Sequence, residues 1–239
     1  MTKQTIAIIG ASGGIGSAFV RLFAEDSSNT VYAFSRSKIN NELENVHCGY
    51  IDFSDEESLK DAAEQSAKEG LLDIVIVATG ILHDTHLMPE KSLRELSAAN
   101  FERNFLANTI GPALAAKHFV PKLQRNKRAL FAALSARVGS IADNRLGGWY
   151  AYRASKAALN MLIKTTSIEV TRSNKHAIIV GLHPGTVDTN LSGPFQKRVP
   201  SDKLFSADYS AQQLASVLEG LSTKDSGKIF AWDGNEVPS

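Results

Sequence analysis

The stretch Thr5-Ile-Ala-Ile-Ile-Gly-Ala-Ser-Gly-Gly-Ile-Gly16 decides the fold that this chain is expected to adopt. Its first part, residues 5–9, is apolar and β-branched, as is typical of a buried parallel strand. The apolar positions within residues 18–23 indicate a helix with one apolar face. The order strand, glycine turn, helix is the order that a dinucleotide-phosphate site requires.

The glycines of this turn have a physical role at such a site. They permit a tight turn and a close approach of the backbone to a phosphate, while the helix N-terminus supplies amide donors and positive dipole. The spacing of Gly10, Gly14 and Gly16 departs from the general G-x-G-x-x-G pattern, and an ordinary glycine turn through Gly13 and Gly14 is the alternative. The position of the turn between strand and helix favours phosphate binding.

Seven strand-like runs recur along the chain and mostly alternate with helices. This pattern predicts a single α/β Rossmann domain over residues 1–239, with a doubly wound parallel sheet and helices on both faces. The expected strands are residues 5–9, 30–34, 46–51, 72–78, 129–134, 177–182 and 227–232. The expected helices are residues 18–23, 55–68, two stretches within 93–117, 157–170 and 210–221, and residues 190–207 are expected to form a flexible lid over the substrate.

Composition limits the classes of function. The net charge is +1 and charged residues make up 21% of the chain, which gives no indication of a nucleic-acid-binding surface. Cys48 is the single cysteine, so no intrachain disulfide can form and a reducing compartment is expected. No signal-peptide pattern or membrane-length apolar run is found. We therefore expect a soluble, cytoplasmic protein that acts on a small molecule.

The second predicted strand ends at Ser35-Arg36-Ser37, where nucleotide-binding folds meet the adenosine ribose. A carboxylate at this position accepts a hydrogen bond from the 2′-hydroxyl of NAD, whereas an arginine accommodates the 2′-phosphate of NADP. Because Arg36 is present and no Asp or Glu is, the sequence favours NADP over NAD. Asp52, after the third strand, is placed beside the adenine. The following Ser54 and Glu57 match a capping box for the helix at 55–68.

Tyr152 and Lys156 are the strongest candidates for chemistry. Residues four apart share one face of a helix, so the phenol and the ammonium can meet above one spot. A nearby cation favours the phenolate, and the pKa of Tyr152 is therefore expected to be lowered toward the range useful for proton transfer. A solvated surface pair is the alternative explanation for such a spacing.

Two further sets of polar residues are weighed in the same way. Asn108 lies inside a predicted helix, although asparagine has a poor helix propensity. Pro112, four residues later, is expected to disturb the backbone hydrogen bonds of this helix. His83 and His86 are spaced as a metal pair could be, but no third ligand is apparent, and we expect loop histidines rather than a metal site.

The motifs taken together resemble the short-chain dehydrogenase/reductase family over nearly the whole chain. They are Gly10-x-x-x-Gly14-x-Gly16, Asn108, Ser135, Tyr152-x-x-x-Lys156 and Pro184-Gly185, in this order. The stretches at 78–83, 134–137 and 150–156 look more like the C-factor and Sniffer-type carbonyl reductase branch of that family.

The resemblance implies roles for individual residues. Tyr152 is the catalytic acid/base, and Lys156 lowers its pKa and holds the nicotinamide ribose. Asn108 maintains the water chain that feeds protons to the lysine. The family's serine commonly stands three residues before a glycine, but Ala136 occupies that place, so Ser135 is preferred for orienting the substrate oxygen and Ser140 is the alternative. The expected cofactor contacts are Gly10, Ser12, Gly13, Gly14, Ile15, Gly16, Arg36, Asp52, Phe53, Thr79, Gly80, Tyr152, Lys156, Pro184, Gly185, Val187 and Thr189.

Three functions compete on these residues. The first is an NADP-dependent oxidoreductase that transfers a hydride between NADPH and a carbonyl or alcohol substrate. The second is a non-catalytic NADP-binding regulatory or signalling protein on the same fold, which the displaced serine favours. The third, a sugar-nucleotide epimerase, generally needs a larger C-terminal domain. The family resemblance also implies a homodimer or homotetramer, through the Ala-rich helices at 101–118 and 154–170.

Overall fold

The computed structural model describes residues 3–238 and contains one seven-stranded parallel sheet. The predicted parallel sheet of a Rossmann fold is confirmed, with the strand order β3-β2-β1-β4-β5-β6-β9. The strands are β1 (Thr5–Ile9), β2 (Thr30–Ser35), β3 (Val46–Tyr50), β4 (Ile74–Val77), β5 (Ala129–Leu134), β6 (Ala177–His183) and β9 (Ile229–Ala231).

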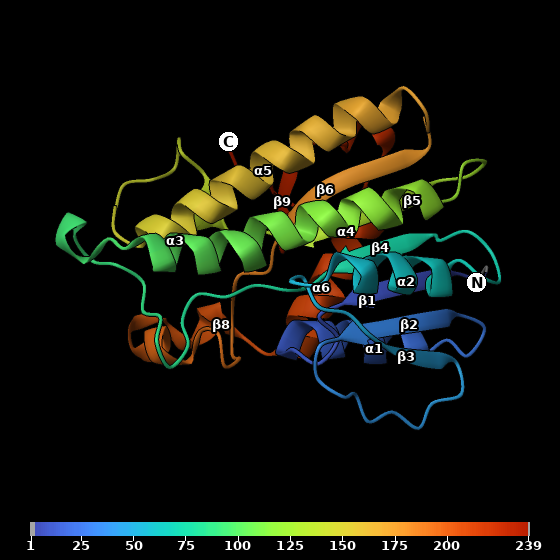
Figure 1. The fold of residues 1–239 in the computed structure, drawn as a ribbon, viewed down its shortest axis with the longest axis horizontal. Helices are drawn as coiled ribbons and strands as arrows, with labels where there is room; N and C mark the ends of the chain where they lie inside the picture. The colour runs from blue at the N-terminus through green and yellow to red at the C-terminus, as the bar shows by residue number, and fades with distance from the viewer. Residues whose placement is uncertain (1–2, 239) are drawn as a thin grey trace.

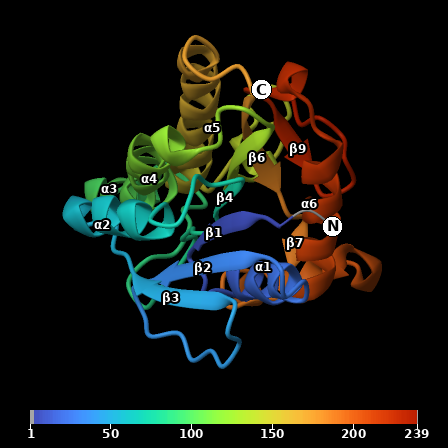
Figure 2. The ribbon, with the colours of Figure 1, turned by 90° about the vertical axis from the view of Figure 1, so that its right-hand side faces the viewer.

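Helices cover both faces of the sheet, so that the structure has three layers (Figures 1 and 2). On one face, α1 (Gly14–Ala24) and α6 (Ala207–Gly220) enclose an apolar core. On the other face, α2 (Glu56–Ser66), α4 (Gly111–Phe119) and α5 (Tyr150–Thr171) enclose a second core, and α3 (Ala98–Phe105) packs against α5. No helix among residues 3–238 is both long and apolar enough to pass through a membrane.

The central helix is interrupted where Asn108 stands. A single π-helical turn, η2 (Leu106–Ile110), joins α3 to α4, and Asn108 is fully buried within it. Such turns occur mostly inside α-helices and frequently at functional sites. The expectation that Asn108 marks a disturbed helical ladder is thus confirmed.

The turn between β1 and α1 could be built only with glycine at two positions. Gly10 has a φ of +86°, which L-residues rarely adopt. A Cβ at Gly16 would lie 2.2 Å from the Gly10 carbonyl oxygen. Helix α1 begins at Gly14, earlier than the apolar pattern from residue 18 predicted, because the glycine turn itself enters the helix.

Three sequence-based boundaries were wrong. Ser54 does not cap α2, because its amide and hydroxyl both donate to Asp52 Oδ1, at 2.9 and 2.8 Å, and the helix instead begins after Asp55. Helix α5 begins at Tyr150 rather than at residue 157. The strand expected at 72–78 has only the four residues of β4.

The segment at 190–207 was expected to be loop-like but contains regular turns. Two short strands, β7 (Thr186–Val187) and β8 (Leu204–Phe205), pair in parallel and close it at its base. Phe205 packs on Trp232, with ring centroids 4.5 Å apart. The remaining short turns of the described chain are η1 (Leu93–Glu95), η3 (Val120–Lys122), η4 (Arg137–Gly139), η5 (Gly193–Arg198), η6 (Ser201–Lys203) and η7 (Thr223–Asp225).

Candidate functional site

A cavity of about 730 Å³ opens at the carboxyl ends of the central strands. This is the edge at which parallel α/β sheets bind ligands, because the strand order reverses there. Thirteen residues predicted from the sequence line this cavity: Ser12, Gly13, Gly14, Ile15, Thr79, Gly80, Ser135, Tyr152, Lys156, Pro184, Gly185, Val187 and Thr189. The glycine turn and the Tyr152/Lys156 pair therefore share one crevice.

The glycine turn has amides free for a ligand. The first hydrogen bond within α1 runs from the Ser17 amide to the Gly13 carbonyl, at 2.8 Å, which leaves the amides of residues 14–16 without partners inside the helix. The Gly13 amide is engaged, since it donates to the Gly10 carbonyl at 3.0 Å. A Cβ at Gly14 would lie 2.5 Å from the Thr189 methyl group, so the chain after β7 lies directly over the turn. A dinucleotide pyrophosphate fits such a cradle, since it needs close backbone approach and amide donors.

Lys156 is buried and tied to the sheet. Its ammonium donates a hydrogen bond to the Leu134 carbonyl at 2.8 Å, and only 2% of the residue is exposed. The Lys156 nitrogen lies 6.0 Å from the centre of the Tyr152 ring. The two side chains thus reach the same place from one face of α5, as their spacing predicted.

Burial shifts the pKa values of both side chains, and that of Tyr152 moves opposite to the direction expected from the sequence. It raises the pKa of Tyr152 to about 12 and lowers the pKa of Lys156 to about 7. The prediction that the lysine lowers the pKa of the phenol is wrong for the protein alone. The reason is that desolvation disfavours both charged forms, and the ammonium is directed at the Leu134 carbonyl.

Asn108 holds the loop after β4 against α5. Its Oδ1 accepts from the Ile81 amide at 2.8 Å, while its Nδ2 donates to the Ile81 carbonyl at 2.9 Å and to Ser155 Oγ at 3.1 Å. A Cβ at Gly80 would lie 3.3 Å from Asn108 Oδ1 and 3.6 Å from the Lys156 ammonium. Because Gly80 has no side chain, the ends of the Asn108 and Lys156 side chains can both lie close to its backbone.

The two candidate serines differ in position. Ser135 lines the cavity, and its hydroxyl donates to Asn160 Oδ1 at 2.6 Å. The Ser140 hydroxyl accepts from the Asp143 amide at 3.1 Å, and Ser140 is not among the cavity-lining residues. The structure therefore places Ser135, not Ser140, at the wall of the cavity.

Five predicted cofactor contacts lie outside the cavity wall. Gly10 and Gly16 shape the turn beneath it. The Phe53 side chain packs against Gly111 of α4 rather than toward the crevice. Asp52 has a lowered pKa, mainly because the Ser54 amide donates to it and, more weakly, because of the nearby Arg36. Arg36 is exposed beside it, at the end of β2.

An aromatic group above Tyr152 was missed in the sequence. Trp149 immediately precedes α5 with a φ of +52°, in the left-handed region that bulky residues rarely adopt. Its ring lies edge-on to Tyr152, with centroids 6.2 Å apart, and to Phe195 of η5, at 5.0 Å. His83 continues the contact, since its ring lies 5.6 Å from Phe195 and its Nε2 bonds to the Asn190 carbonyl at 2.9 Å. Within the described residues, no cluster of three His, Cys, Asp or Glu could hold a metal.

Glu90 was also missed, since nothing in its sequence context marks it. It is 1% exposed, and its carboxylate accepts from the Ala151 amide, in the first turn of α5, at 3.2 Å. Its backbone carbonyl accepts from the Trp149 amide at 2.5 Å. A buried acid thus compensates the N-terminal dipole of the helix that carries Tyr152.

The chain is similar in sequence and in fold to known proteins. The family described as short chain dehydrogenase matches residues 4–199 of the chain. The C-signal of Myxococcus xanthus is 35% identical over 147 residues, which cover 62% of this chain and 83% of that protein. NADPH-bound carbonyl reductase from chicken fatty liver superposes with a TM-score of 0.84 and 25% identity, over 100% of this chain and 95% of that one. The carbonyl reductase Sniffer of D. melanogaster has a TM-score of 0.85 and 23% identity over 100% of both chains.

The buried lysine generates a prediction about stability. The folded protein holds fewer protons on Lys156 than the unfolded chain does between pH 7 and pH 10.5, so its contribution to stability rises with pH in that window. Replacing it by an uncharged side chain, Lys156→Met, should raise the free energy of unfolding at pH 7 by roughly 2–4 kcal/mol in the absence of cofactor. The gain should shrink as the pH approaches 10.

Urea unfolding at pH 7 and at pH 9.5 measures this difference. Lys164→Met, on the exposed side of the same helix, is the matched control and should change stability little at either pH. A Lys156→Met protein that is less stable than the wild type at pH 7 would contradict the prediction.

Proposed function

We propose a function for this chain from the premise that it belongs to the short-chain dehydrogenase family. It is an oxidoreductase of this type, and we propose that it reduces a carbonyl compound to an alcohol with NADPH. The observation that carries the proposal is the single crevice that brings Tyr152 and Lys156 to the glycine turn. The chicken carbonyl reductase, similar in fold along the whole chain, is described as NADPH-bound, which supports the choice of cofactor.

The residues present fit a dinucleotide. The glycine turn offers close approach and free amides, and the hydroxyl of Thr79 beside it is buried without a hydrogen-bond partner among the described residues. When bound, NADPH supplies the hydride. We propose that the amides of residues 12 and 14–16 bind the pyrophosphate, since the Gly13 amide donates to the Gly10 carbonyl, and that Lys156 binds the nicotinamide ribose.

Tyr152 is proposed as the general acid. With a pKa of about 12, the phenol holds its proton at neutral pH and can give it to a carbonyl oxygen that gains negative charge. Burial within the crevice excludes water from this transfer. The anionic cofactor favours the charged form of Lys156, which in turn stabilises the phenolate left after the proton has moved.

Two residues are proposed in supporting roles. Asn108 holds the backbone of Ile81 and the Ser155 hydroxyl, and so fixes the distance between the loop after β4 and the Lys156 turn of α5. Ser135 is proposed to contact the substrate from the cavity wall. Because its hydroxyl donates to Asn160 Oδ1, the Ser135 oxygen offers a hydrogen-bond acceptor to a hydroxyl of the substrate rather than a donor to a carbonyl.

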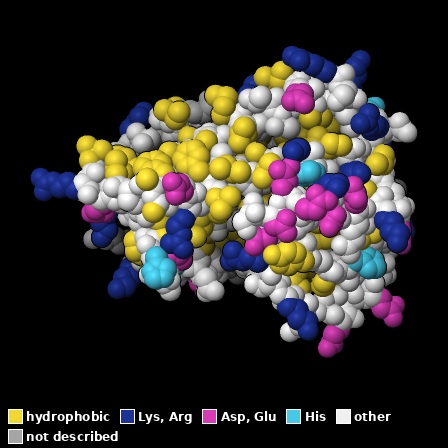
Figure 3. All heavy atoms as spheres, in the orientation of Figure 1, with side chains coloured by type: hydrophobic (Ala, Val, Ile, Leu, Met, Phe, Trp, Pro, Cys, Tyr) yellow, Lys and Arg dark blue, Asp and Glu magenta, His cyan; other side chains and the backbone are white. Residues whose placement is uncertain are grey.

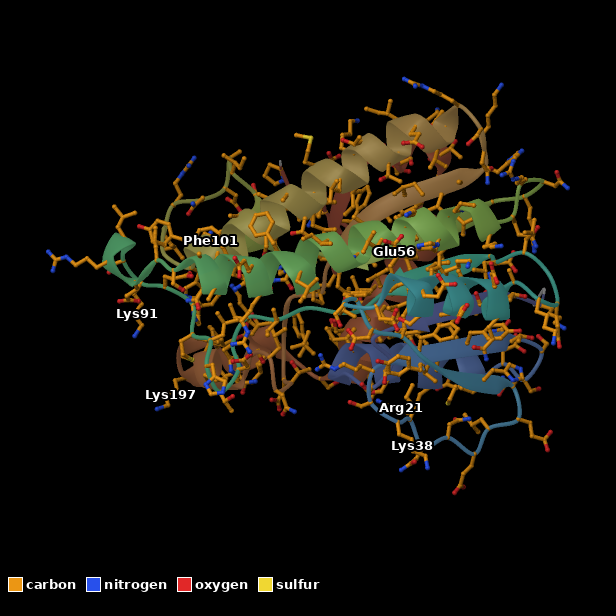
Figure 4. The ribbon with its side chains drawn as sticks, viewed as in Figure 1. Arg21, Lys38, Glu56, Lys91, Phe101 and Lys197 are labelled. Carbon is orange, nitrogen blue, oxygen red and sulfur yellow. The ribbon has the colours of Figure 1, made fainter. Side chains whose placement is uncertain are left out.

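Residues 190–207 are proposed as the substrate lid. They cover the catalytic residues through Phe195, which lies against Trp149, and Leu191, whose methyl carbon would lie 3.8 Å from a Cβ at Gly80. Lys197 of this segment and Lys91 lie at the same end of the molecule as the start of α3 (Figure 4).

An oligomer is proposed through the helices at 101–118 and 154–170. Their outer faces carry exposed apolar side chains, Leu106, Ile110, Met161 and Ile168, and apolar atoms gather over this face in Figure 3. We expect a homodimer or homotetramer. Sedimentation at micromolar concentration tests this, and a monomer at all concentrations would contradict it.

The alternative, a non-catalytic NADP-binding signalling protein, is favoured by one observation: the relative from Myxococcus xanthus is named C-signal. The two functions share the fold and the cofactor site. They differ in whether Tyr152 takes part in turnover.

The proposed reaction is tested with Tyr152→Phe. Removal of the phenolic oxygen should lower kcat by about 10³-fold, because general acid catalysis contributes roughly 10²–10⁴. NADPH binding, followed by the fluorescence of the nicotinamide, should remain within about threefold of the wild type, since the phenol is not needed to hold the cofactor. A substrate for this measurement is found by screening a panel of carbonyl compounds for NADPH consumption by the wild type.

Tyr209→Phe, on α6 and 42% exposed, is the matched control and should keep full activity. A Tyr152→Phe enzyme with a near-normal rate would refute the assignment of the acid. A wild-type protein that binds NADPH but consumes none with any carbonyl would favour the signalling alternative.

The preference for NADPH is tested at Arg36. Loss of a charged hydrogen bond to the 2′-phosphate costs about 1.5–3 kcal/mol, so Arg36→Ala should weaken NADPH binding roughly 10- to 100-fold and leave NADH binding unchanged. Lys38→Ala is the control, because Lys38 lies on the same loop and extends into solvent (Figure 4). Equal binding of NADPH and NADH by the wild type would remove Arg36 from this role.

A further inference from the structure

Two buried polar side-chain atoms have no hydrogen-bond partner among the described residues: Thr79 Oγ1 and His183 Nδ1. Buried polar groups are nearly always paired, so each unpaired one requires an explanation. Thr79 lies beside the glycine turn, where its methyl carbon would be 2.8 Å from a Cβ at Gly10, and the cofactor accounts for it. Nothing in the proposed roles accounts for His183.

The imidazole of His183 faces the catalytic helix. Side chains alternate between the two faces of a strand, and Leu182 is buried in the core on the α1 and α6 side. A Cβ at Gly181 would lie 3.0 Å from Ile163 of α5. His183 is two residues beyond Gly181 on β6, so it projects to the same side as Gly181, toward α5.

His183 also lies at the level of the Tyr152 and Lys156 turns. The Ser135 amide donates to the Leu182 carbonyl at 2.7 Å, which places the ends of β5 and β6 side by side. The Ser135 hydroxyl bonds to Asn160, one helical turn after Lys156. In agreement with this, His183 lines the same cavity as Tyr152 and Lys156.

Two other polar side chains of this wall, Lys156 and Ser135, are already engaged. The Lys156 ammonium donates to the Leu134 carbonyl, and the Ser135 hydroxyl donates its hydrogen bond to Asn160 Oδ1. Reduction of a carbonyl places negative charge on its oxygen, and donors that are fixed in advance stabilise that charge. Tyr152 supplies one donor, and a second is missing from the residues described so far.

We infer that His183 supplies the second hydrogen bond to the reacting substrate oxygen, as a neutral imidazole that donates from Nδ1. This inference rests on the proposed carbonyl reduction. It assigns His183 as a catalytic residue that touches the substrate, in a site where Ala136 offers no hydroxyl.

The surroundings of His183 keep its ring neutral. The pKa of His183 is lowered to about 4, mainly by burial and also by the nearby Arg137, while Asp233 opposes the shift. A neutral imidazole can donate from Nδ1 when Nε2 carries the lone pair. Because it is not protonated near pH 7, it polarises the carbonyl without supplying the proton that Tyr152 transfers.

The test uses His183→Leu and His183→Asn in the full-length protein. His183→Leu should lower kcat about 100-fold, as the loss of one such donor does in other enzymes. NADPH binding should stay within about threefold of the wild type. The Tm should not fall, because Nδ1 has no hydrogen-bond partner to lose within the residues that the structure describes. His183→Asn should recover activity to within about tenfold of the wild type, since an amide nitrogen can stand near the position of Nδ1.

His176→Leu is the matched control, an exposed histidine directly before the same strand, and it should leave every readout unchanged. Normal kcat in His183→Leu would overturn the inference. So would a Tm that falls in both variants, or a loss of NADPH binding that parallels the loss of rate, because His183 would then support the fold or the cofactor. Absence of NADPH-dependent turnover in the wild type would instead refute the proposed function, and this inference with it.

Discussion

The hydrogen bond from the buried Lys156 ammonium to the Leu134 carbonyl is the interaction on which the site depends. Leu134 is the last residue of β5, so this bond fixes the height of α5 relative to the carboxyl edge of the sheet. Glu90 holds the start of the same helix through the Ala151 amide. With both anchors in place, Tyr152 can face only the space above the strand ends. Burial disfavours the charged ammonium, and the pKa of Lys156 is low for this reason.

The second constraint is the distance between α5 and the loop after β4. Asn108 sets it by bonding to both the amide and the carbonyl of Ile81 while it reaches Ser155. The π turn that carries Asn108 interrupts the regular α-helical hydrogen bonds between α3 and α4, and the Asn108 amide reaches α5 from this turn. Gly80 then leaves room for Lys156. The groups proposed to be catalytic are thus held by backbone and amide contacts, which fix their positions before a ligand binds.

Much of this arrangement could be predicted from sequence because it follows from local patterns. The glycine turn, the buried apolar strands and the four-residue spacing of Tyr152 and Lys156 each depend on residues close together in the chain. Other features depend on residues far apart. Glu90 meets Ala151 across 61 positions, and the ring of Phe195 meets Trp149 only because η5 folds back over the cavity. The pKa values of Tyr152 and Lys156 depend on burial, which a charge-pair argument cannot supply. Similarly, Ser54 matched a capping pattern, but Asp52 takes its hydrogen bonds.

A crystal structure of the protein with NADPH tests the central claim most directly. The account predicts the pyrophosphate at the amides of residues 12 and 14–16, the nicotinamide ring in van der Waals contact with Tyr152, and the ribose within hydrogen-bond distance of Lys156. A nicotinamide ring held elsewhere, with the Tyr152 phenol turned away from it, would contradict the account and leave only the fold.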